Sequence, residues 1–551
     1  PSRCYAAPAV GTPVLLYLLA LAARAMAAAG FPDPAYPDAF YYVDAARAIA
    51  DGRGLTVDFV WIFAEVGGRV PAEPTLPIPA FGHWMPLASL VQVPFLWLLG
   101  PEPAASVAPF LLVGALAAPL TWAIAREAGL PARGAVAAGV IAAVPGLLLP
   151  FLAQPDNFGL YEPIVAGALW ATSRALRGSG RAFVAASLLA GLAVLSRNDG
   201  WLVVGVVGLA VIWDRLRTRA VGGGPSRIGL RSIVVGALVL ALVVGPWYLR
   251  QVATLGTASP SAASGKALFI RDIAEWNSIT TPATLDHLLG MGMGPLLASR
   301  ALGLAAAVGI FAVLVGGIAL VPFAAVGAWR RRRSTVFGPF FTYGAFLFAF
   351  SALVSAVHVP GGTFIHSAVA LAPHATVLAV DGILAAVAWA AARRRRWRPL
   401  EAERVFLGAA AAWMVGLAIV GSLATHATWA TKRERMLAVA TALDRAGAAP
   451  SDRLMSIDAA GYRYHTGRGG IVLPNDPLPA IEAAARAYGI RWLVLEADET
   501  VPTVAPILLA DERPAWVGPP VWRDGTAVAV YPVCTTPADD RCRVGSAGGL
   551  R

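Results

Sequence analysis

The chain has 551 residues, of which 57% are hydrophobic and 14% are charged. About a quarter of the residues in soluble domains are charged, so this composition excludes an ordinary soluble protein and indicates an integral membrane protein. The formal net charge of +11 does not indicate a nucleic-acid partner, because the arginines stand in short groups between apolar segments, the pattern that orients membrane helices.

Apolar segments follow one another along the chain, and most are long enough to cross a bilayer as helices. They lie at about 10–29, 82–100, 104–125, 133–152, 159–176, 182–196, 200–214, 231–249, 297–329, 336–358, 364–390 and 404–424. Heavy use of Ala, Gly, Arg and Pro with few Lys is typical of a GC-rich bacterial genome.

Arginine-rich loops set the expected orientation, because Lys and Arg accumulate in loops that stay in the cytoplasm. These loops contain Arg126 and Arg133; Arg174, Arg177 and Arg181; Arg215 to Arg231; Arg330 to Arg333; and Arg393 to Arg398. All of these loops lie in the cytoplasm only if one early apolar segment does not cross the membrane. Segment 82–100 is the expected exception, an interfacial or half-inserted helix, since it contains Gln92 and Pro94. The prediction is a polytopic α-helical membrane protein with about eleven transmembrane helices.

This orientation places residues 30–103, a loop with juxtamembrane helices, and the loop 250–296 outside the cytoplasm. Both belong to a predicted transmembrane domain over residues 1–428. Residues 429–535 contain strand-like runs at 454–457, 492–495 and 527–531 and a helical run at 478–488, which predict a small extracytoplasmic α/β domain. A flexible tail is expected over 536–551. Cys534 and Cys542 either pair as a disulfide in this compartment or remain free.

An acidic, aromatic stretch over residues 36–47 follows the first apolar segment. Asp38 follows Pro37 at the start of an expected short helix, where an aspartate commonly caps the first turn. We expect Asp38 to cap this helix, which does not exclude a catalytic role, because a capping carboxylate still offers its second oxygen.

Three further ionisable residues are expected near Asp38. Asp156 lies in a turn on the same side, where the two carboxylates form a base with its support or hold a divalent cation such as Mg²⁺ or Mn²⁺; alternatively, Asp156 only caps the next helix. Glu162 is expected to face the same cavity, since an unpaired Glu against lipid is costly. Arg197 ends an apolar segment on the outer side, where it binds a phosphate, pairs with Asp199 or extends to lipid headgroups.

Histidine and aromatic side chains also stand on the outer side. His83 and His366 lie at the outer ends of apolar segments, and their spacing matches no zinc motif; each alone is more commonly a structural hydrogen bonder than a ligand. Tyr41, Tyr42 and Trp84 are aromatic residues at an interface, where such residues are ordinary anchors.

At these residues the chain resembles the C-type glycosyltransferase (GT-C) superfamily, in particular the bacterial relatives of protein O-mannosyltransferases and lipid A aminoarabinose transferases. The resemblance covers essentially the whole chain and rests on residues 37–42, 51–54, 83–87, 156, 191–197 and 362–367. The chain departs from the family pattern at Ala39, where many relatives carry a second acidic residue. It also departs at the start of the next apolar segment, where Trp84 and Met85 interrupt the His-Pro-Pro sequence of the family.

The resemblance implies an enzyme of the bacterial plasma membrane that transfers a sugar from a polyprenyl-phosphate donor to a protein, glycan or lipid acceptor outside the cytoplasm. Asp38 would take the proton of the acceptor hydroxyl or position that hydroxyl, with Asp156 as the second carboxylate, and Arg197 with His366 would stabilise the leaving phosphate. Tyr41, Tyr42 and Trp84 would contact the sugar or the lipid. Two alternatives remain: a transporter or lipid flippase, and an inactive protein of this fold that assembles envelope proteins.

Overall fold

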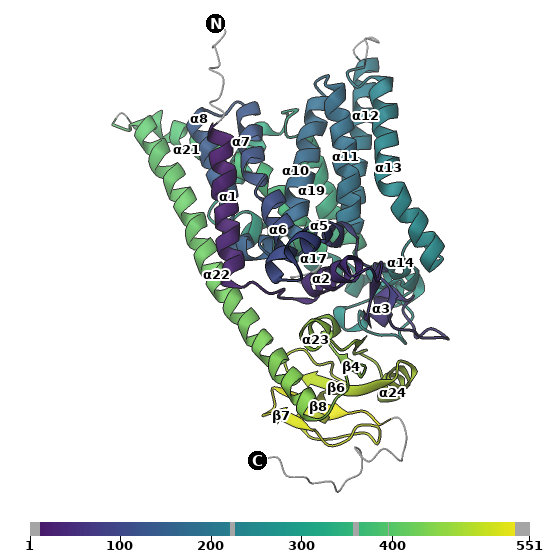
Figure 1. Ribbon diagram of the computed structural model, residues 1–551. Helices are drawn as coiled ribbons and strands as arrows, with labels where there is room; N and C mark the ends of the chain where they lie inside the picture. The colour runs from purple at the N-terminus through teal and green to yellow at the C-terminus, as the bar shows by residue number, and fades with distance from the viewer. Residues whose placement is uncertain (1–10, 221–225, 356–362, 395, 535–551) are drawn as a thin grey trace.

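A computed structural model describes residues 11–220, 226–355, 363–394 and 396–534 (Figure 1). Apolar helices form one bundle, and a small α/β domain lies at one end of it. By length and composition, seven helical segments of the described residues can cross a membrane. They are Gly11–Gly30 (α1), Pro103–Glu127 (α6 and α7), Ala132–Leu152 (α8 and α9), Leu230–Leu255 (α13), Met293–Val315 (α17 and η4), Phe364–Ala391 (within α20 and α21) and Pro399–Arg445 (α22).

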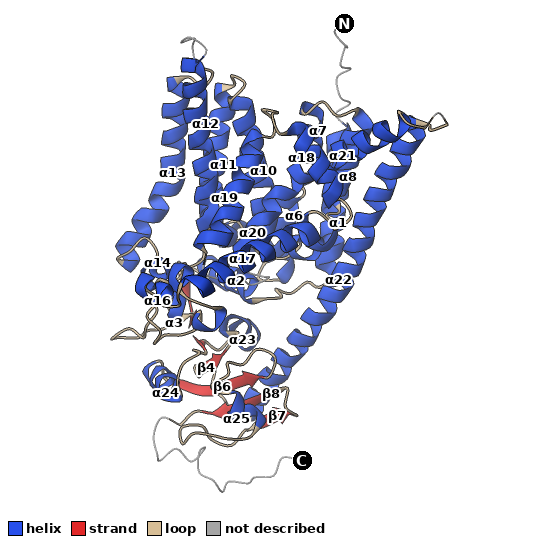
Figure 2. Cartoon of the chain, turned by 180° about the vertical axis from the view of Figure 1, so that it is seen from behind, coloured by secondary structure: helices blue, strands red, loops and turns tan. Residues whose placement is uncertain are grey.

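Further helices run within the same bundle (Figure 2). They are α10 (Phe158–Ala175), α11 (Gly180–Ser196), α12 (Trp201–Ala220), α18 (Val321–Arg331), and α19 (Gly338–Ala349), which η5 (Phe350–Val354) continues. Helix α18 continues the crossing that α17 and η4 begin, so it does not count as a separate span. Together with the seven segments above, α10, α11, α12 and α19 make up the predicted set of about eleven spans. Large apolar side chains such as Leu242 and Leu249 of α13 stay exposed on the bundle, as expected of helices that face lipid.

Segment 82–100 does not cross the bundle. It forms two short helices, α4 (Leu87–Leu90) and α5 (Val93–Leu99), and α5 lies at the end that faces the α/β domain (Figure 1). The apolar stretch Leu87–Leu99 is about 20 Å long at about 1.5 Å per residue, less than the roughly 30 Å of a bilayer core. With α2 (Pro37–Ala50) and α3 (Ile62–Glu65), these helices are the predicted juxtamembrane helices.

The loop between α13 and α17 lies at the same end of the bundle (Figures 1 and 2). It folds into α14 (Pro260–Ser264), α15 (Lys266–Phe269), η3 (Ile273–Glu275) and α16 (Leu285–Leu289). Helix α14 packs against α3 of the first loop, so the two long loops form one layer beneath the helices.

The α/β domain is built on a six-stranded sheet in the order β2-β5-β4-β6-β8-β7. Its strands are β4 (Arg453–Ser456), β5 (Gly470–Val472), β6 (Ile490–Glu496), β7 (Trp522–Asp524) and β8 (Val528–Pro532), and its helices are α23 (Ala459–Thr466), α24 (Leu478–Ala487) and α25 (Ala505–Leu509). Strands β4, β6 and β8 and helix α24 coincide with the predicted runs. Cys534 follows β8 and is disulfide-bonded, whereas its expected partner Cys542 lies outside the described residues.

The edge strand of this sheet comes from the first loop. Strand β2 (Phe59–Val60) pairs in parallel with β5, so that Phe59 lies opposite Gly470. A Cβ atom at Gly470 would lie 1.9 Å from the carbonyl oxygen of Leu454 in β4, so glycine is required where the strands approach. The remaining strands of the loop, β1 (Thr56–Val57) and β3 (Ile78–Pro79), pair with each other.

Helix α22 joins the bundle to the domain without a break and passes the expected boundary at residue 428 (Figures 1 and 2). Beyond this boundary its side chains pair with acidic residues of the domain: Lys432 with Asp458 at 3.0 Å and Arg435 with Glu496 at 2.9 Å. One contiguous apolar core extends from the bundle through the first loop into the sheet. The two parts are therefore packed against each other.

Candidate functional site

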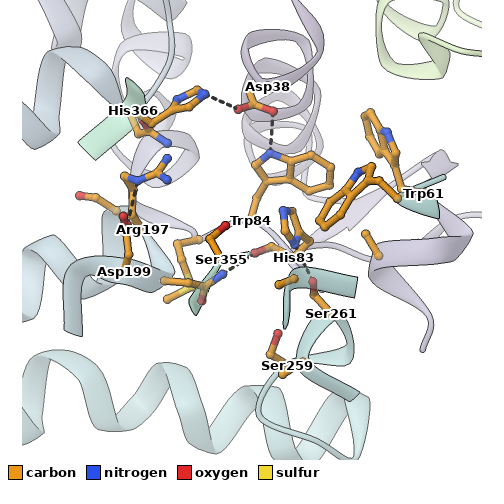
Figure 3. A pocket seen from close by; sticks show the side chains of 18 of the residues that line it. Asp38, Trp61, His83, Trp84, Arg197, Asp199, Ser259, Ser261, Ser355 and His366 are labelled. Carbon is orange, nitrogen blue, oxygen red and sulfur yellow. Dashed lines mark hydrogen bonds and ion pairs between the residues drawn. The ribbon is translucent and has the colours of Figure 1, made fainter. Parts of the chain in front are cut away.

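A cavity of about 590 Å³ lies where the two long loops meet the bundle (Figure 3). Its walls come from segments distant in the sequence: the start of α2, residues 61–85, the turn between α11 and α12, the α14–η3 region and α20 (Thr363–Ala368). Of the predicted site residues, Asp38, Tyr42, His83, Trp84, Arg197 and His366 line this cavity.

Asp38 lies in the first turn of α2 but does not cap it. The N-cap residue is Tyr36, which makes no side-chain capping bond, so the prediction of a capping Asp38 is wrong. Pro37 is favoured at the first helical position, and it moves Asp38 one residue into the helix. The Asp38 Oδ1 atom instead accepts a hydrogen bond of 2.9 Å from Trp84 Nε1. The Asp38 side chain remains 27% exposed, which leaves it accessible from the cavity.

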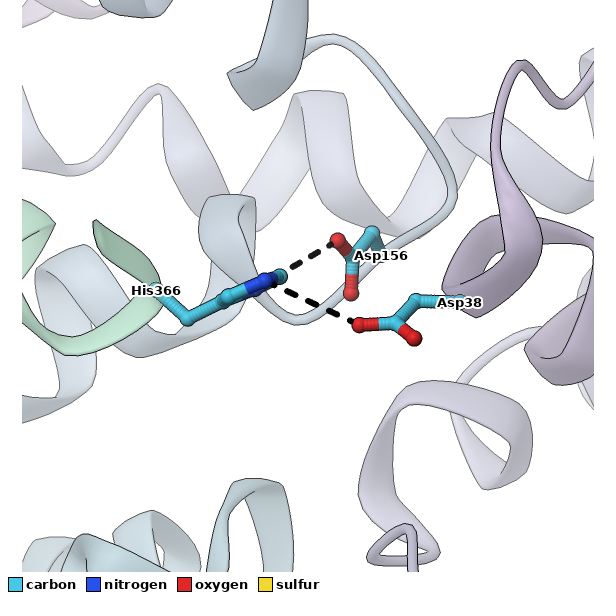
Figure 4. Close-up of side chains that lie close together, drawn as sticks. All are labelled: Asp38, Asp156 and His366. Atoms are coloured by element: carbon cyan, nitrogen blue, oxygen red, sulfur yellow. Dashed lines mark ion pairs between the residues drawn. The ribbon is translucent and has the colours of Figure 1, made fainter. Parts of the chain in front are cut away.

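His366 connects Asp38 with Asp156 (Figure 4). Its Nε2 atom lies 3.8 Å from Asp38 Oδ2, and its Nδ1 atom lies 3.9 Å from Asp156 Oδ2. The imidazole stacks on Phe158, with 4.4 Å between ring centroids. Asp156 itself is fully buried and accepts a hydrogen bond of 2.9 Å from the Tyr36 hydroxyl. The cavity therefore exposes Asp38, while Asp156 lies behind it.

Burial makes both carboxyl groups more basic than usual. Burial raises the pKa of Asp156 to about 7, and the negative charge of Asp38 adds to this shift. Burial also raises the pKa of Asp38, although the hydrogen bond from Trp84 opposes the change. Two carboxyl groups so close together titrate as a pair. A raised pKa suits a base that acts near neutral pH.

The same three residues fit a divalent cation. One ligand atom from each of Asp38, Asp156 and His366 can be chosen so that all lie within 4.8 Å of one another. Within the part of the chain that the structure describes, these three are the His, Cys, Asp or Glu side chains that come close enough together to hold one metal ion. Two carboxylates and an imidazole suit Mn²⁺ or another transition metal better than Mg²⁺, which prefers oxygen ligands.

Arg197 follows α11 in extended backbone and turns its side chain into the cavity (Figure 3). Its Nε atom donates to Asp199 Oδ1 and to Ser367 Oγ, each at 2.9 Å, and Ser367 Oγ also donates to Asp199 Oδ2. Among the described residues, none accepts a hydrogen bond from the terminal nitrogens of Arg197. Arg197 thus pairs with Asp199, which is one of the alternatives drawn from the sequence, and its amino groups face the cavity; phosphate binding stays a prediction.

A tight turn fixes this arginine. A Cβ atom at Gly200 would lie 2.3 Å from the carbonyl oxygen of Ala193, so only glycine allows the 3₁₀ turn Asn198–Gly200 (η2) to close against the end of α11. The Asn198 side chain then donates a hydrogen bond of 2.8 Å to the carbonyl oxygen of His83, which links this turn to the first loop.

His83 and Trp84 lie on the opposite side of the cavity from Arg197 (Figure 3). A hydrogen bond of 2.9 Å joins His83 Nδ1 and Ser261 Oγ of α14. Burial, with a smaller effect of Arg197, lowers the pKa of His83 to about 4, so its imidazole is uncharged at neutral pH. The indole of Trp84 contacts Trp61, with 4.6 Å between ring centroids.

The two tyrosines have different positions. Tyr42 lines the cavity, and its hydroxyl accepts a hydrogen bond of 3.2 Å from Asn157. Tyr41 lies behind Trp84 and stacks on it, with 4.3 Å between ring centroids. Its hydroxyl donates a hydrogen bond of 2.9 Å to Glu65. Tyr41 thus supports the cavity wall without being part of it.

Glu162 does not reach the cavity. It forms an ion pair of 3.0 Å with Arg24 of α1, and both side chains are buried inside the bundle. This pairing removes the cost of an ionisable side chain at membrane depth.

Sequence reasoning missed several residues that line the cavity, including Trp61, Asp199, Ser259, Ser261 and Trp276. Asp199 was considered only as a partner of Arg197. The others lie in the long loops, where no periodic pattern marks which side chains point inward.

No protein-family model and no curated protein sequence matches the chain. Its structure is similar to that of ArnT from Cupriavidus metallidurans bound to undecaprenyl phosphate, with a TM-score of 0.60 and 14% identity over 98% of this chain and 100% of that chain. It is also similar to the archaeal oligosaccharyltransferase AglB from Archaeoglobus fulgidus, in complex with an inhibitory peptide and a dolichol-phosphate, with a TM-score of 0.52 and 13% identity over 89% of this chain and 69% of that chain. Both are GT-C membrane glycosyltransferases. Along almost its whole length, the chain therefore has the GT-C fold that its sequence resembles.

Proposed function

We propose that this chain is a membrane glycosyltransferase that moves a sugar from a polyprenyl-phosphate donor to an acceptor hydroxyl. The observation that carries this proposal is that Asp38, His366 and Arg197 line one cavity at the domain-facing end of the bundle. A base and a phosphate-binding cation are the two groups that such a transfer needs. The shared fold with ArnT, solved with undecaprenyl phosphate, and AglB, solved with a dolichol-phosphate, supports a polyprenyl-phosphate donor.

In this transfer the acceptor oxygen forms a bond to the anomeric carbon while the bond from that carbon to the phosphate oxygen breaks. The acceptor proton passes to Asp38, and the electron pair of the broken bond leaves with the polyprenyl phosphate. Asp38 suits this role because Trp84 holds its Oδ1 atom, which orients Oδ2 as the oxygen that takes the proton. A fixed base and acceptor lower the entropic part of the barrier.

Arg197 would bind the phosphate through its terminal nitrogens. Because Asp199 and Ser367 already hold its Nε atom, the guanidinium is oriented before the substrate binds and needs no rearrangement as charge develops. His366 lies between this arginine and Asp38 (Figure 3) and would complete the polar surface. In the alternative in which Asp38, Asp156 and His366 hold a divalent cation, Asp38 would not act as the base, and the cation would supply Lewis-acid stabilisation of the phosphate.

The distribution of arginines supports an extracytoplasmic cavity in a bacterial plasma membrane. Helix α7 ends and α8 begins, and likewise α12 ends and α13 begins, at the end of the bundle remote from the α/β domain (Figure 1). Arg126 and Arg133 flank the first connection, and Arg215, Arg217 and Arg219 precede the second. Because arginine-rich loops stay in the cytoplasm, the cavity and the α/β domain would lie on the other side.

The test uses the full chain in membranes and a panel of radiolabelled undecaprenyl-phosphate-linked hexoses and pentoses. We expect the wild type to release undecaprenyl phosphate and label an acceptor. Asp38→Asn should lower turnover by about 10²- to 10⁴-fold, the usual contribution of a general base, while binding of undecaprenyl phosphate persists. Equal turnover by both proteins would contradict the role of Asp38 and favour an inactive scaffold.

A second pair of variants tests the donor site. Arg197→Lys keeps the charge but loses the planar fork, so undecaprenyl phosphate should bind about tenfold more weakly. Arg231→Lys is the matched control, because Arg231 is exposed in the first turn of α13 at the other end of the bundle. Equal affinities for both variants, or no binding by the wild type, would contradict the proposed donor site.

A further inference from the structure

The cavity has two ends of different chemistry. Its ionised side chains, Asp38, Arg197 and Asp199, lie toward His366. Trp61, Trp84 and Trp276 surround the other end, together with His83 and Ser261. Among the described residues that line the cavity, no Asp, Glu, Lys or Arg lies at this aromatic end. His83 does not change this, since burial holds its pKa near 4.

Trp84 separates the two ends (Figure 3). Its Nε1–H group points to Asp38, and the rest of its indole contacts Trp61. Trp276 meets His83 edge to face, with 5.6 Å between ring centroids. The aromatic end therefore presents indole surfaces beside an imidazole and a serine hydroxyl, directly next to the proposed base.

This combination fits a neutral saccharide ring. A sugar ring has an apolar C–H face, which packs on an aromatic surface, and hydroxyl groups at its edge, which need hydrogen-bond partners. A ligand pocket of this kind is mostly apolar, with few polar groups that fix orientation. A charged acceptor would lack a counter-ion at the aromatic end and would lose its hydration there.

The direction of the reaction separates acceptor from donor. In an in-line displacement the attacking oxygen enters opposite the leaving group, and Arg197 marks the leaving phosphate. In Figure 3, Trp84 lies directly below Asp38 and Trp61 lies farther to the right, whereas Arg197 lies to the left. The aromatic end is therefore on the opposite side of the cavity from Arg197. We propose that the Trp61–Trp84–Trp276 end of the cavity is the acceptor subsite and that it binds a neutral saccharide, so the acceptor is a glycan. This inference rests on the proposed function and deepens it.

The α/β domain holds both outer tryptophans in place. Trp61 directly follows β2, which pairs with β5 of the domain. Trp276 precedes Asn277, whose carbonyl oxygen accepts a hydrogen bond of 3.0 Å from the Asn475 backbone. The domain contributes no described residue to the cavity wall, yet it positions the acceptor end.

The test measures binding to the full chain in lipid nanodiscs by saturation-transfer NMR. The probes are neutral methyl hexosides, methyl pentosides and their disaccharides, with a serine- and threonine-containing peptide as the counter-probe. We expect glycoside binding that Trp276→Ala weakens roughly tenfold, as loss of one aromatic contact predicts, and that Trp276→Phe partly restores. Trp329→Ala is the control, because Trp329 is 69% exposed on α18. Binding of undecaprenyl phosphate should be the same in all variants.

Three results would overturn the inference: no glycoside binding, equal binding by wild type and Trp276→Ala, or binding of the peptide in place of the glycosides. Displacement of the glycoside by an undecaprenyl-phosphate-linked sugar would also overturn it, because the subsite would then belong to the donor sugar. Failure of the proposed function looks different, since undecaprenyl phosphate would not bind while the glycoside measurement would still report on the tryptophans.

Discussion

Asp38 and Asp156 share one histidine, and this arrangement decides at which pH the cavity accepts a proton. The pKa of Asp156 is raised to about 7, and that of Asp38 is also raised. A general base must be unprotonated, so kcat/KM should rise with pH through the pKa of Asp38 and decline below it. The observed value belongs to the pair, because the two groups titrate together.

Two substitutions should move this pH dependence in opposite directions. Asp156→Asn removes the carboxyl group of the pair whose pKa is raised to about 7, so the acid limb of kcat/KM should shift to lower pH, toward the pKa of Asp38 alone. Trp84→Phe removes the hydrogen bond that favours the charged form of Asp38, so the acid limb should shift to higher pH. The measurement is kcat/KM between about pH 5 and 9. Shifts in the same direction would contradict the assignment of Asp38 as the base.

Elements with their own periodic pattern were predictable from the sequence. The apolar runs predicted the bundle, and alternating residues predicted β4, β6 and β8. Strand β2 was not predictable, because two residues, Phe59 and Val60, carry no period and their partner β5 lies about 400 residues later in the chain.

The candidate site was predictable in part. Asp38, Asp156, Arg197 and His366 were found because charged side chains are rare in this chain and stand at helix ends. Their distances, and the aromatic end with Trp276, depend on how long loops fold together, which spacing does not encode. Ala39, where a second acidic residue is absent, shows the same limit, since the second carboxyl group near Asp38 is that of Asp156, 118 positions after Asp38. His366 lies close to both carboxyl groups.

One contact between elements controls the loop that carries Trp276. Asp476 of the domain is buried and accepts hydrogen bonds from Ser278 Oγ and the Ile279 backbone, each at 2.7 Å. Asp476→Ala removes these acceptors and leaves buried donors unpaired, at about 1–3 kcal/mol each. We expect faster hydrogen exchange over residues 274–284 and about a tenfold higher KM for the acceptor, with unchanged binding of undecaprenyl phosphate.

The control for Asp476→Ala is Glu482→Ala on α24. Glu482 pairs with Arg486 on the same helix face and does not line the cavity. Hydrogen exchange of residues 274–284 and the KM for the acceptor should therefore stay as in the wild type. If Asp476→Ala weakened the binding of undecaprenyl phosphate as much as it raised the KM for the acceptor, the loop would support the whole cavity and not only its aromatic end.

At the scale of the molecule, α22 couples the membrane bundle to the α/β domain. The sequence places a boundary at residue 428, where hydropathy declines, but the helix continues to Arg445. Two of its charged residues beyond the boundary, Lys432 and Arg435, pair with buried carboxylates of the domain. The loss of hydropathy therefore marks the end of the membrane-facing surface and not the end of the helix.

The pair of Lys432 and Asp458 gives this coupling a measurable size. Asp458 is 1% exposed and lies 3.0 Å from Lys432 Nζ, so Lys432→Met leaves a buried carboxylate without its cation. Breaking a buried ion pair in this way costs about 3–5 kcal/mol, and the free energy of unfolding of the domain should fall by that amount. The double variant Lys432→Met/Asp458→Asn should recover part of the loss, because no buried charge remains.

The matched control for this pair lies on the same helix. Arg398→Met removes the partner of Glu401 at the other end of α22, where both side chains are exposed, and should change stability by less than about 1 kcal/mol. Chemical denaturation followed by hydrogen exchange of β4 and α23 measures the domain separately from the bundle. Lys432→Met should also shift the acid limb of kcat/KM to higher pH, because the charge of Asp458 raises the pKa of Asp38 and Lys432 would no longer offset it. Equal stability of Lys432→Met and Arg398→Met would show that the domain is held to the bundle by its apolar core and not by these ion pairs.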